Sequence, residues 1–231
     1  MNAGFGNKVH TETKADNFDL FMRANRLTLV VIAWCAAMML ALYQPFIKIW
    51  TGGNPDLVRH ALTPLLMVAY FCVNQSRQPL LTFKGAASIW REDRWKPIVA
   101  GSANLAMNIS FVLFLPDEYK LDGVILSTIL SCIIIQMPWE AHVVFTVFFN
   151  REQGRRYWLA QLRFATSAIA MGALTWGAVH AIPLAGPVGF VIDGSVAMLV
   201  AGCLAICLFR RDMAAIFGCL RSQARCDSTG K

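Results

Sequence analysis

Long apolar runs divide this chain, and they limit what it can fold into more than any other feature. Several of these runs reach the ~20 residues that an α-helix, rising ~1.5 Å per residue, needs to cross a hydrocarbon core of ~30 Å. With 56% hydrophobic and 15% charged residues, the chain is more apolar than an ordinary soluble domain. An open sheet would leave unpaired backbone groups in lipid. The sequence therefore predicts an all-α, polytopic membrane helix bundle.

We expect six transmembrane helices within a transmembrane region from 27 to 209. Their predicted ranges are about 27–47, 61–81, 97–116, 123–149, 159–181 and 188–209. The last two come from one apolar stretch that is too long for a single crossing, and the IPLAGP sequence at Ile182–Pro187 predicts the turn that divides it. Pro138 predicts a kink in the fourth helix, because proline cannot donate a backbone hydrogen bond.

Lysine and arginine are concentrated in alternate gaps between the apolar runs. Of the 21 basic residues, only Lys48, Arg59 and Lys120 fall in the other gaps. Basic residues accumulate on the cytoplasmic side of membrane proteins, so the asymmetry predicts that both termini are cytoplasmic. The formal net charge of +7 is then a property of the loops. We expect the lipid bilayer, and not nucleic acid, to be the partner of this basic surface.

The two ends of the chain flank the transmembrane region on that side. Residues 210–231 are a basic cytoplasmic tail, and residues 1–26 are a lead-in without the short apolar core of a cleaved signal peptide. Within the lead-in, Phe18, Phe21 and Met22 have helical spacing among charges. Two interpretations stay open for them: a helix along the inner membrane interface, and a solvated approach to the first span.

Residues suited to metal binding or catalysis are scattered. The four histidines are at positions 10, 60, 142 and 180, and five of the seven cysteines are inside predicted spans. Cys203 and Cys207 are one helical turn apart without a histidine or carboxylate companion, so packing is favoured over metal ligation. The sequence contains neither a phosphate-binding glycine loop nor a nucleophile motif. We predict no metal, no cofactor and no enzymatic activity.

The segment from Asn74 to Asn104 has the most distinctive pattern in the chain. It reads NQSRQPLLTFKGAASIWREDRWKPIVAGSAN, and GFGN at Gly4–Asn7 and QPFIKIWTG at Gln44–Gly52 precede it. Within it are an Arg-x-Pro step, a Phe-Lys step, an Ala-Ala pair before tryptophan and a DRWKP turn. In these features the chain resembles the Wzx-type polysaccharide flippases of the multidrug/oligosaccharidyl-lipid/polysaccharide exporter superfamily. The resemblance extends to about Arg156.

The resemblance implies movement of an undecaprenyl-diphosphate-linked oligosaccharide across the bacterial cytoplasmic membrane during surface-polysaccharide assembly. Such flippases have two helical bundles, and this chain resembles the C-terminal one alone. Alternating access requires two bundles that rock around a shared site. We therefore expect a separately encoded N-terminal bundle and a lipid-linked glycan as partners. A noncatalytic membrane subunit and a nonfunctional truncated gene product stay open as alternatives, as does a membrane glycosyltransferase or acyltransferase that uses Glu140 or His142.

The first candidate substrate-binding residues surround Arg77. On a continuous helix, Asn74, Arg77 and Gln78 share one face through i, i+3 and i+4 spacing, near the inner end of the second predicted span. A guanidinium offers five donors in a fixed fork that matches phosphate oxygens. Two interpretations stay open: Arg77 extends to lipid headgroups, or it contacts the substrate diphosphate.

Further substrate-binding candidates lie in the next loop and helix. Arg94 and Lys96 are interleaved with tryptophans, a composition typical of an interfacial anchor, and first contact with the diphosphate is the alternative. Asn104 and Asn108 are at mid-membrane depth, where their amides must face other helices or water. Inter-helix bonding is favoured for them over sugar contact in a central cavity.

Glu140 is the sole carboxylate of the fourth predicted span. Ionisable groups within spans are default sites for coupling protons or cations, so Glu140 is the coupling-ion candidate. Gln136, four residues earlier, is predicted to share its helix face. Because Glu140 is close to the inner end of its helix, simple contact with cytoplasmic water stays open as the alternative.

Overall fold

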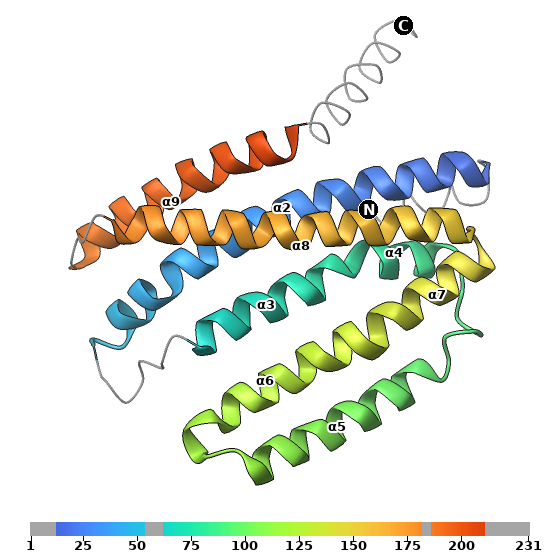
Figure 1. The fold of residues 1–231 in the computed structure, drawn as a ribbon, viewed down its shortest axis with the longest axis horizontal. Coiled ribbons are helices and arrows are strands. Elements are labelled where there is room, and N and C mark those ends of the chain that lie inside the picture. The colour runs from blue at the N-terminus through green and yellow to red at the C-terminus, as the bar shows by residue number, and fades with distance from the viewer. Residues whose placement is uncertain (1–12, 54–61, 182–185, 211–231) are drawn as a thin grey trace, which may run out of the picture.

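The computed structural model describes residues 13–53, 62–181 and 186–210, and this part of the chain is almost entirely helical (Figure 1). Its longer helices are α2 (Lys14–Trp50), α3 (Leu62–Ser76), α5 (Lys96–Phe114), α8 (Arg151–His180) and α9 (Gly186–Leu208). Its shorter ones are α4 (Gln78–Ala86), α6 (Lys120–Ser131) and α7 (Met137–Val147), with the 3₁₀ turn η1 (Asp117–Tyr119) and the π turn η2 (Cys132–Gln136). No strand occurs in these ranges, and the all-α prediction is confirmed.

Five helical segments in the described ranges are long and apolar enough to cross a membrane. They are α2, α5, the continuous segment from η1 to α7, α8 and α9. Large apolar side chains such as Phe114, Ile169 and Val188 are exposed on their outer faces, as expected where lipid replaces water as the solvent. The protein is therefore a multi-pass membrane bundle, and its described residues hold five such helices where the sequence predicts six.

The second predicted span, 61–81, is not a single helix. α3 ends at Ser76 after 15 residues, a rise of ~22 Å that is short of a ~30 Å hydrocarbon core. Arg77 interrupts the helix, and α4 begins directly after it with Pro79 in its first turn. Proline lacks an N–H group and restricts the residue before it, which explains the interruption. The carbonyl of Ser76 accepts a hydrogen bond from the Gln161 side chain at 3.4 Å.

The first helix starts well before the predicted span. α2 has 37 residues, a rise of ~56 Å, and Thr13 caps it by accepting a hydrogen bond from the backbone N–H of Asp16 at 3.3 Å. Phe18, Phe21 and Met22 are buried in the protein. Neither interpretation of these three residues, interfacial helix or solvated lead-in, matches this packing, because other helices cover them.

A π turn replaces the kink predicted at Pro138. η2 precedes α7, which carries Pro138 in its first turn. A proline ring clashes with the carbonyl four residues before it and offers no N–H group, so the helix widens just before the proline. The predicted irregularity is present, about one turn nearer the N-terminus than Pro138 itself.

The last two helices agree with the prediction in number and differ in one boundary. α8 begins at Arg151, earlier than the predicted 159, because Asn150 and Gln153 form a reciprocal capping box. α9 nearly coincides with the predicted 188–209. Residues 182–185 of the predicted turn lie outside the described residues, as do residues 1–12 with GFGN, Arg59 and the tail from 211 onwards.

The two ends of the bundle differ in charge because α2, α3 with α4, α5, α6 with α7, α8 and α9 alternate in direction (Figure 1). The start of α2, the region from α4 to the start of α5, the α7–α8 connection and the end of α9 lie toward one end, here called the basic end. Its described cations are Lys14, Arg23, Arg26, Arg77, Lys84, Arg91, Arg94, Lys96, Arg151, Arg155, Arg156, Arg163 and Arg210. The described part of the opposite end holds Lys48 and Lys120.

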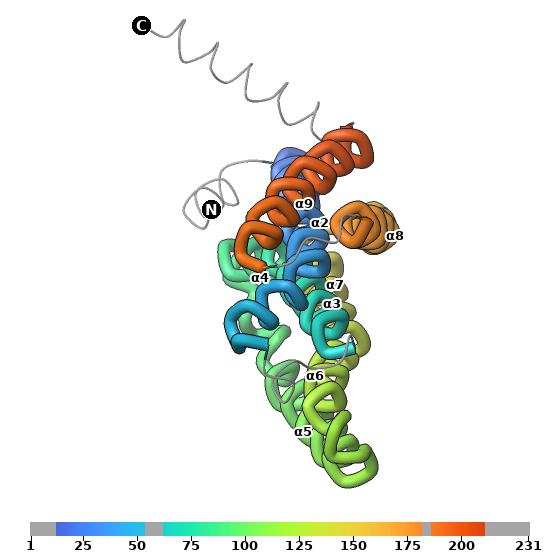
Figure 2. The backbone as a smooth tube through the Cα atoms, turned by 90° about the vertical axis from the view of Figure 1, so that its left-hand side faces the viewer, coloured from blue at the N-terminus to red at the C-terminus, as the bar shows by residue number. Residues whose placement is uncertain are grey.

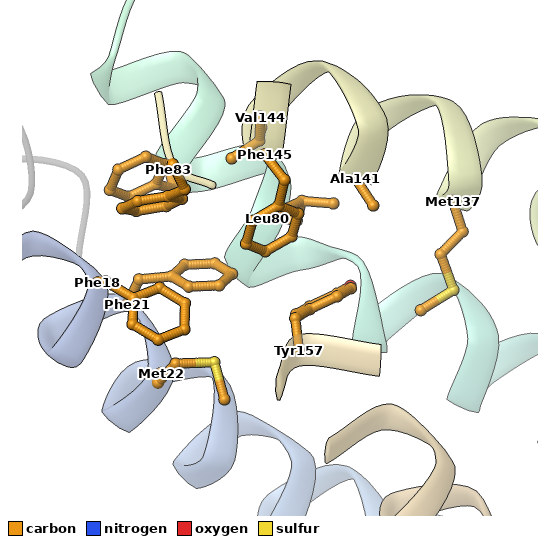
Figure 3. Close-up of a cluster of buried hydrophobic side chains, with 11 residues drawn as sticks. Phe18, Phe21, Met22, Leu80, Phe83, Met137, Ala141, Val144, Phe145 and Tyr157 are labelled. Carbon is orange, nitrogen blue, oxygen red and sulfur yellow. The ribbon is translucent and has the colours of Figure 1, made fainter. Parts of the chain in front are cut away.

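Two kinds of packing hold the helices together. At the basic end, aromatic rings from α2, α4, α7 and α8 pack on one another, and Phe21, Phe83 and Tyr157 are fully buried (Figure 3). Farther along, α2, α8 and α9 pack through small and aliphatic residues such as Ala33 and Ala201. α5 packs mainly against α6 and η2, and this hairpin projects from the rest of the bundle (Figure 2).

Candidate functional site

Arg77 and Glu140 form a two-bond ion pair inside the protein. Arg77 lies in the break between α3 and α4, and Glu140 lies in the first turn of α7. Arg77 Nη2 lies 2.6 Å from Glu140 Oε1, and Arg77 Nε donates to Glu140 Oε2 at 3.1 Å. The two side chains are 6% and 0% exposed. The pair is therefore shielded from water although it lies toward the basic end.

Two lysines and an aspartate extend this pair into a network. Lys96, at the start of α5, donates through Nζ to Glu140 Oε1 at 2.5 Å, and the same Nζ lies 3.4 Å from Asp93 Oδ2. Lys84, in the last turn of α4, forms a short ion pair with Asp93 Oδ2. We call Arg77, Lys84, Asp93, Lys96 and Glu140 the ion network. Its three cations face two carboxylates, which leaves one positive charge uncompensated.

The connection from α4 to α5 folds back to complete this network. Ser88 adopts a left-handed conformation, with φ of 55°, that reverses the chain after α4. Ile89 is then buried against the protein. Farther along, Asp93 and Lys96 face inward, whereas Arg94 between them stays exposed. The connection therefore sorts its charged residues into an inner set and an outer set.

Burial makes each member of the network depend on the others. Moving an ion out of water costs several kcal/mol, and pairing offsets this cost only when the geometry is good. A buried ion pair is consequently weak evidence for a stabilising role. Ionisable groups inside a membrane bundle are more often functional. We therefore treat the ion network as the candidate functional site.

The network has unused hydrogen-bonding capacity. Each lysine ammonium offers three donors, and Lys84 meets a single carboxylate among the described residues. Asp93 Oδ1 is buried without a hydrogen-bond partner. Unused donors and an uncompensated positive charge are what an oxyanion needs for binding. The arrangement can hold an anion by exchange of ion-pair partners, without covalent chemistry.

Of the predicted site residues, the structure brings Arg77, Lys96 and Glu140 together. Glu140 is fully buried, so the alternative in which it simply contacts cytoplasmic water does not apply. Gln136, predicted to share the face of Glu140, points its amide instead at the Ser131 hydroxyl at 3.4 Å. Gln136 is the last residue of the π turn, whose register differs from that of α7, where Glu140 lies, and this explains the difference.

Three other candidates on α4 and its flanks lie outside the network. The face predicted for Asn74, Arg77 and Gln78 does not form, because the helix breaks at Arg77 and Gln78 is exposed. Arg94 is exposed, with its guanidinium 5.7 Å from the centre of the Trp95 ring. That position agrees with the interfacial anchor predicted for this loop.

Asn104 and Asn108 bond to a neighbouring helix. The Ser127 hydroxyl on α6 lies 3.3 Å from Asn104 Oδ1 and makes a shorter contact with Asn108 Oδ1. Both asparagines are on α5, so these bonds tie the two helices of the hairpin together. The structure therefore favours the inter-helix role for both asparagines, as the sequence did.

Lys84 and Asp93 are members of the site that sequence reasoning missed. The sequence pattern assigns both of them to a charged gap between spans, where solvent exposure is expected. Their burial depends on the backward fold after Ser88. Pro79 and Pro97 each lie in the first turn of a helix, so the sequence could have indicated where α4 and α5 begin, but not that the connection between them turns inward.

Within the described residues, no group of three or more His, Cys, Asp or Glu side chains lies close enough together to hold a metal ion. Comparison of the chain with models of known protein families, with curated proteins and with solved structures found no match. The class of protein is therefore defined by the fold and the candidate site alone. The protein is an all-α, multi-pass membrane bundle with an ion network buried among its helices.

Proposed function

We propose that this chain is the C-terminal bundle of a flippase that moves undecaprenyl-diphosphate-linked oligosaccharide across the cytoplasmic membrane for surface-polysaccharide assembly. The observation that carries the proposal is the ion network, with its excess positive charge and its fork-shaped guanidinium in the interior of a membrane bundle. The diphosphate is the part of such a substrate that these donors match. The resemblance of residues 74–104 to flippases supports the same assignment.

The substrate binds by exchange of partners. A phosphate presents oxygens to a guanidinium in the same two-bond geometry as a carboxylate, so the diphosphate competes with Glu140 for Arg77. Lys84 and Lys96 add compact point charges beside it. Glu140, once released from Arg77, keeps Lys96 or takes up a proton, which is the role of a coupling-ion residue. No covalent bond forms or breaks.

The proposed transport needs a second bundle. Rocking of one bundle against another around a shared site is the general mechanism of such transporters. The described helices form one bundle, with the ion network between α4, α7 and the start of α5. We therefore assign the other half of the transporter to a separately encoded N-terminal bundle.

Paired expression tests this proposal. Cells that lack the flippase would receive this chain, a candidate N-terminal bundle, or both, and export of lipid-linked glycan would be measured. We expect export from the pair alone. Arg77→Lys in the pair should reduce export strongly, because an ammonium cannot replace a two-bond contact. The exposed neighbour Arg91 provides the matched control, Arg91→Lys, with export unchanged.

Two outcomes of the export assay would contradict the proposal, and they differ in what they exclude. No export from any tested pair would exclude the flippase assignment and favour a subunit of another kind or a nonfunctional product. Export at the wild-type level with Arg77→Lys would keep the flippase assignment but remove the ion network as the diphosphate site.

The proposed orientation places the basic end in the cytoplasm. Arg155 is exposed at that end, so Arg155→Cys should resist a membrane-impermeant thiol reagent in intact cells and react in inside-out vesicles. Lys120→Cys at the opposite end should show the reverse pattern. Labelling of Arg155→Cys from outside intact cells would contradict the orientation.

A further inference from the structure

A basic groove lies between α7 and the first turns of α8, which meet at the basic end (Figure 1). Its volume is about 780 Å³. None of the residues that line it belongs to the ion network. The groove follows the side of α7 that carries the exposed His142, whereas Glu140, two residues earlier, faces the interior. It is therefore a separate feature that the proposed transport mechanism does not use.

The floor of the groove is apolar and closely packed. Ala141, Phe145 and Phe149 of α7 line it and are buried. Gly154 of α8 lies directly against Phe145, because a Cβ at this glycine would be 3.3 Å from the nearest ring carbon. A side chain at position 154 would push the two helices apart. The glycine thus lets α7 and α8 close the floor beneath the groove.

The rim of the groove carries positive charge without an acidic partner. Arg151 and Arg155 line it one helical turn apart, and no carboxylate of the described residues lines it. Glu152 lies between them in the sequence but pairs with Arg156 at 2.7 Å. Neither Arg151 nor Arg155 forms an ion pair with another described residue. Two guanidinium groups are left for an anion, and their geometry matches phosphate oxygens.

A second hollow, of about 410 Å³, continues the groove away from the arginines. It shares Pro138 and His142 with the groove, and its other lining residues are Ile134, Ile135 and Trp139. From Phe149 back to Ile134 the helix rises roughly 22 Å, whereas one leaflet of a ~30 Å hydrocarbon core is ~15 Å thick. Ile134 is 64% exposed. An apolar path longer than one leaflet therefore leads from the basic rim toward the middle of the bundle.

We propose that this groove binds an anionic membrane phospholipid, with its phosphate on Arg151 and Arg155 and one acyl chain along the apolar floor toward Ile134. Basic pockets between transmembrane helices are a general mode of lipid recognition. Trp158 lines the groove beside the arginines and is 40% exposed, as is typical of the membrane interface, where lipid phosphates lie. A soluble phosphate would use the arginines alone, so the apolar continuation selects a lipid.

Lipid titration of the purified full chain in detergent tests the site, with native mass spectrometry as the readout. We expect dioleoylphosphatidylglycerol to be retained in preference to dioleoylphosphatidylcholine, and glycerol phosphate not to displace it. Arg151→Gln with Arg155→Gln should weaken phosphatidylglycerol binding about tenfold or more. The matched control is Arg91→Gln with Arg163→Gln, which removes the same charge from exposed positions of the basic end outside the groove.

A second variant blocks the groove without changing its charge. Thr146 is exposed and lines the groove, so Thr146→Trp should weaken phosphatidylglycerol binding to a similar degree. Thr166→Trp, at an exposed threonine of α8 outside the groove, is the control and should bind as the wild type does. Arg77→Lys should also leave phosphatidylglycerol binding unchanged, because the groove and the ion network are separate sites.

Each opposite result would overturn the proposal. Equal retention of the two phospholipids, or equal losses in the two double variants, would indicate general attraction to the basic end. Wild-type binding by Thr146→Trp would mean that the lipid does not occupy the groove. Displacement by glycerol phosphate would mean that the phosphate alone is recognised. A loss caused by Arg77→Lys would place the lipid on the ion network instead.

Discussion

The ion network and the α2–α8–α9 interface place very different residues in the interior of one bundle. In the network, five charged side chains are buried together and each depends on its partners. In the interface, Ala197 and Ala201 of α9 are fully buried against neighbouring helices, and close approach of the backbones supplies the contact. The α2–α8–α9 interface thus associates through small residues. The ion network instead places charges among α4, α5 and α7, and ionisable groups inside a membrane bundle point to a functional role.

The largest loss of stability is expected from a substitution in the ion network. Glu140→Ala leaves Arg77 and Lys96 buried without their shared partner, so we expect a loss of ~3–5 kcal/mol in stability. Unfolding in mixed detergent micelles would measure it. Glu118→Ala, at an exposed carboxylate toward the opposite end, is the control and should change little. Equal stability of the two variants would mean that the buried charges are not coupled.

A smaller effect is expected in the alanine interface. Ala201 is fully buried, and Ala201→Leu forces extra methyl groups between tightly packed helices, at ~1–3 kcal/mol. Cys203→Leu, on the lipid-facing side of the same helix, should be close to neutral in the same unfolding assay. If Cys203→Leu destabilises as much as Ala201→Leu, α9 does not pack through its alanine face.

The smallest effect is expected in the α5–α6 hairpin. Ser127→Ala removes the hydroxyl that contacts Asn104 and Asn108, and polar contacts between membrane helices average ~0.6 kcal/mol. Ser110→Ala removes a hydroxyl whose bond among the described residues stays within its own helix, to the Ala106 carbonyl at 2.8 Å, and serves as the control. A loss from Ser127→Ala no larger than from Ser110→Ala would exclude an inter-helix role.

Sequence patterns predicted the features that depend on hydropathy, on charge and on the cost of unpaired polar groups in lipid. The helix over Lys96–Phe114 and the helix over Gly186–Leu208 follow directly from uncharged runs of lipid-spanning length. Asn104 and Asn108 were expected to bond between helices because unpaired amides are costly in lipid. The charge difference between the ends of the bundle follows from the gaps in the same way.

What sequence patterns missed depends on tertiary structure. The break at Arg77 came from Pro79 within an apolar run, where hydropathy alone indicates an unbroken span. The inward turn of Lys84 and Asp93 depends on the chain reversal at Ser88, and no periodic pattern marks such a reversal. Arg77, Lys96 and Glu140 were identified singly, but their meeting at one point required the packed helices.

The most direct test of the central claim is the affinity of the purified full chain for undecaprenyl diphosphate. We predict saturable binding that Arg77→Lys weakens about tenfold, because the two-bond contact is lost while the charge is kept. Arg77→Ala should weaken it further, and Arg94→Ala, at an exposed arginine, should change it little. Unchanged affinity in both Arg77 variants would contradict the ion network as the diphosphate site.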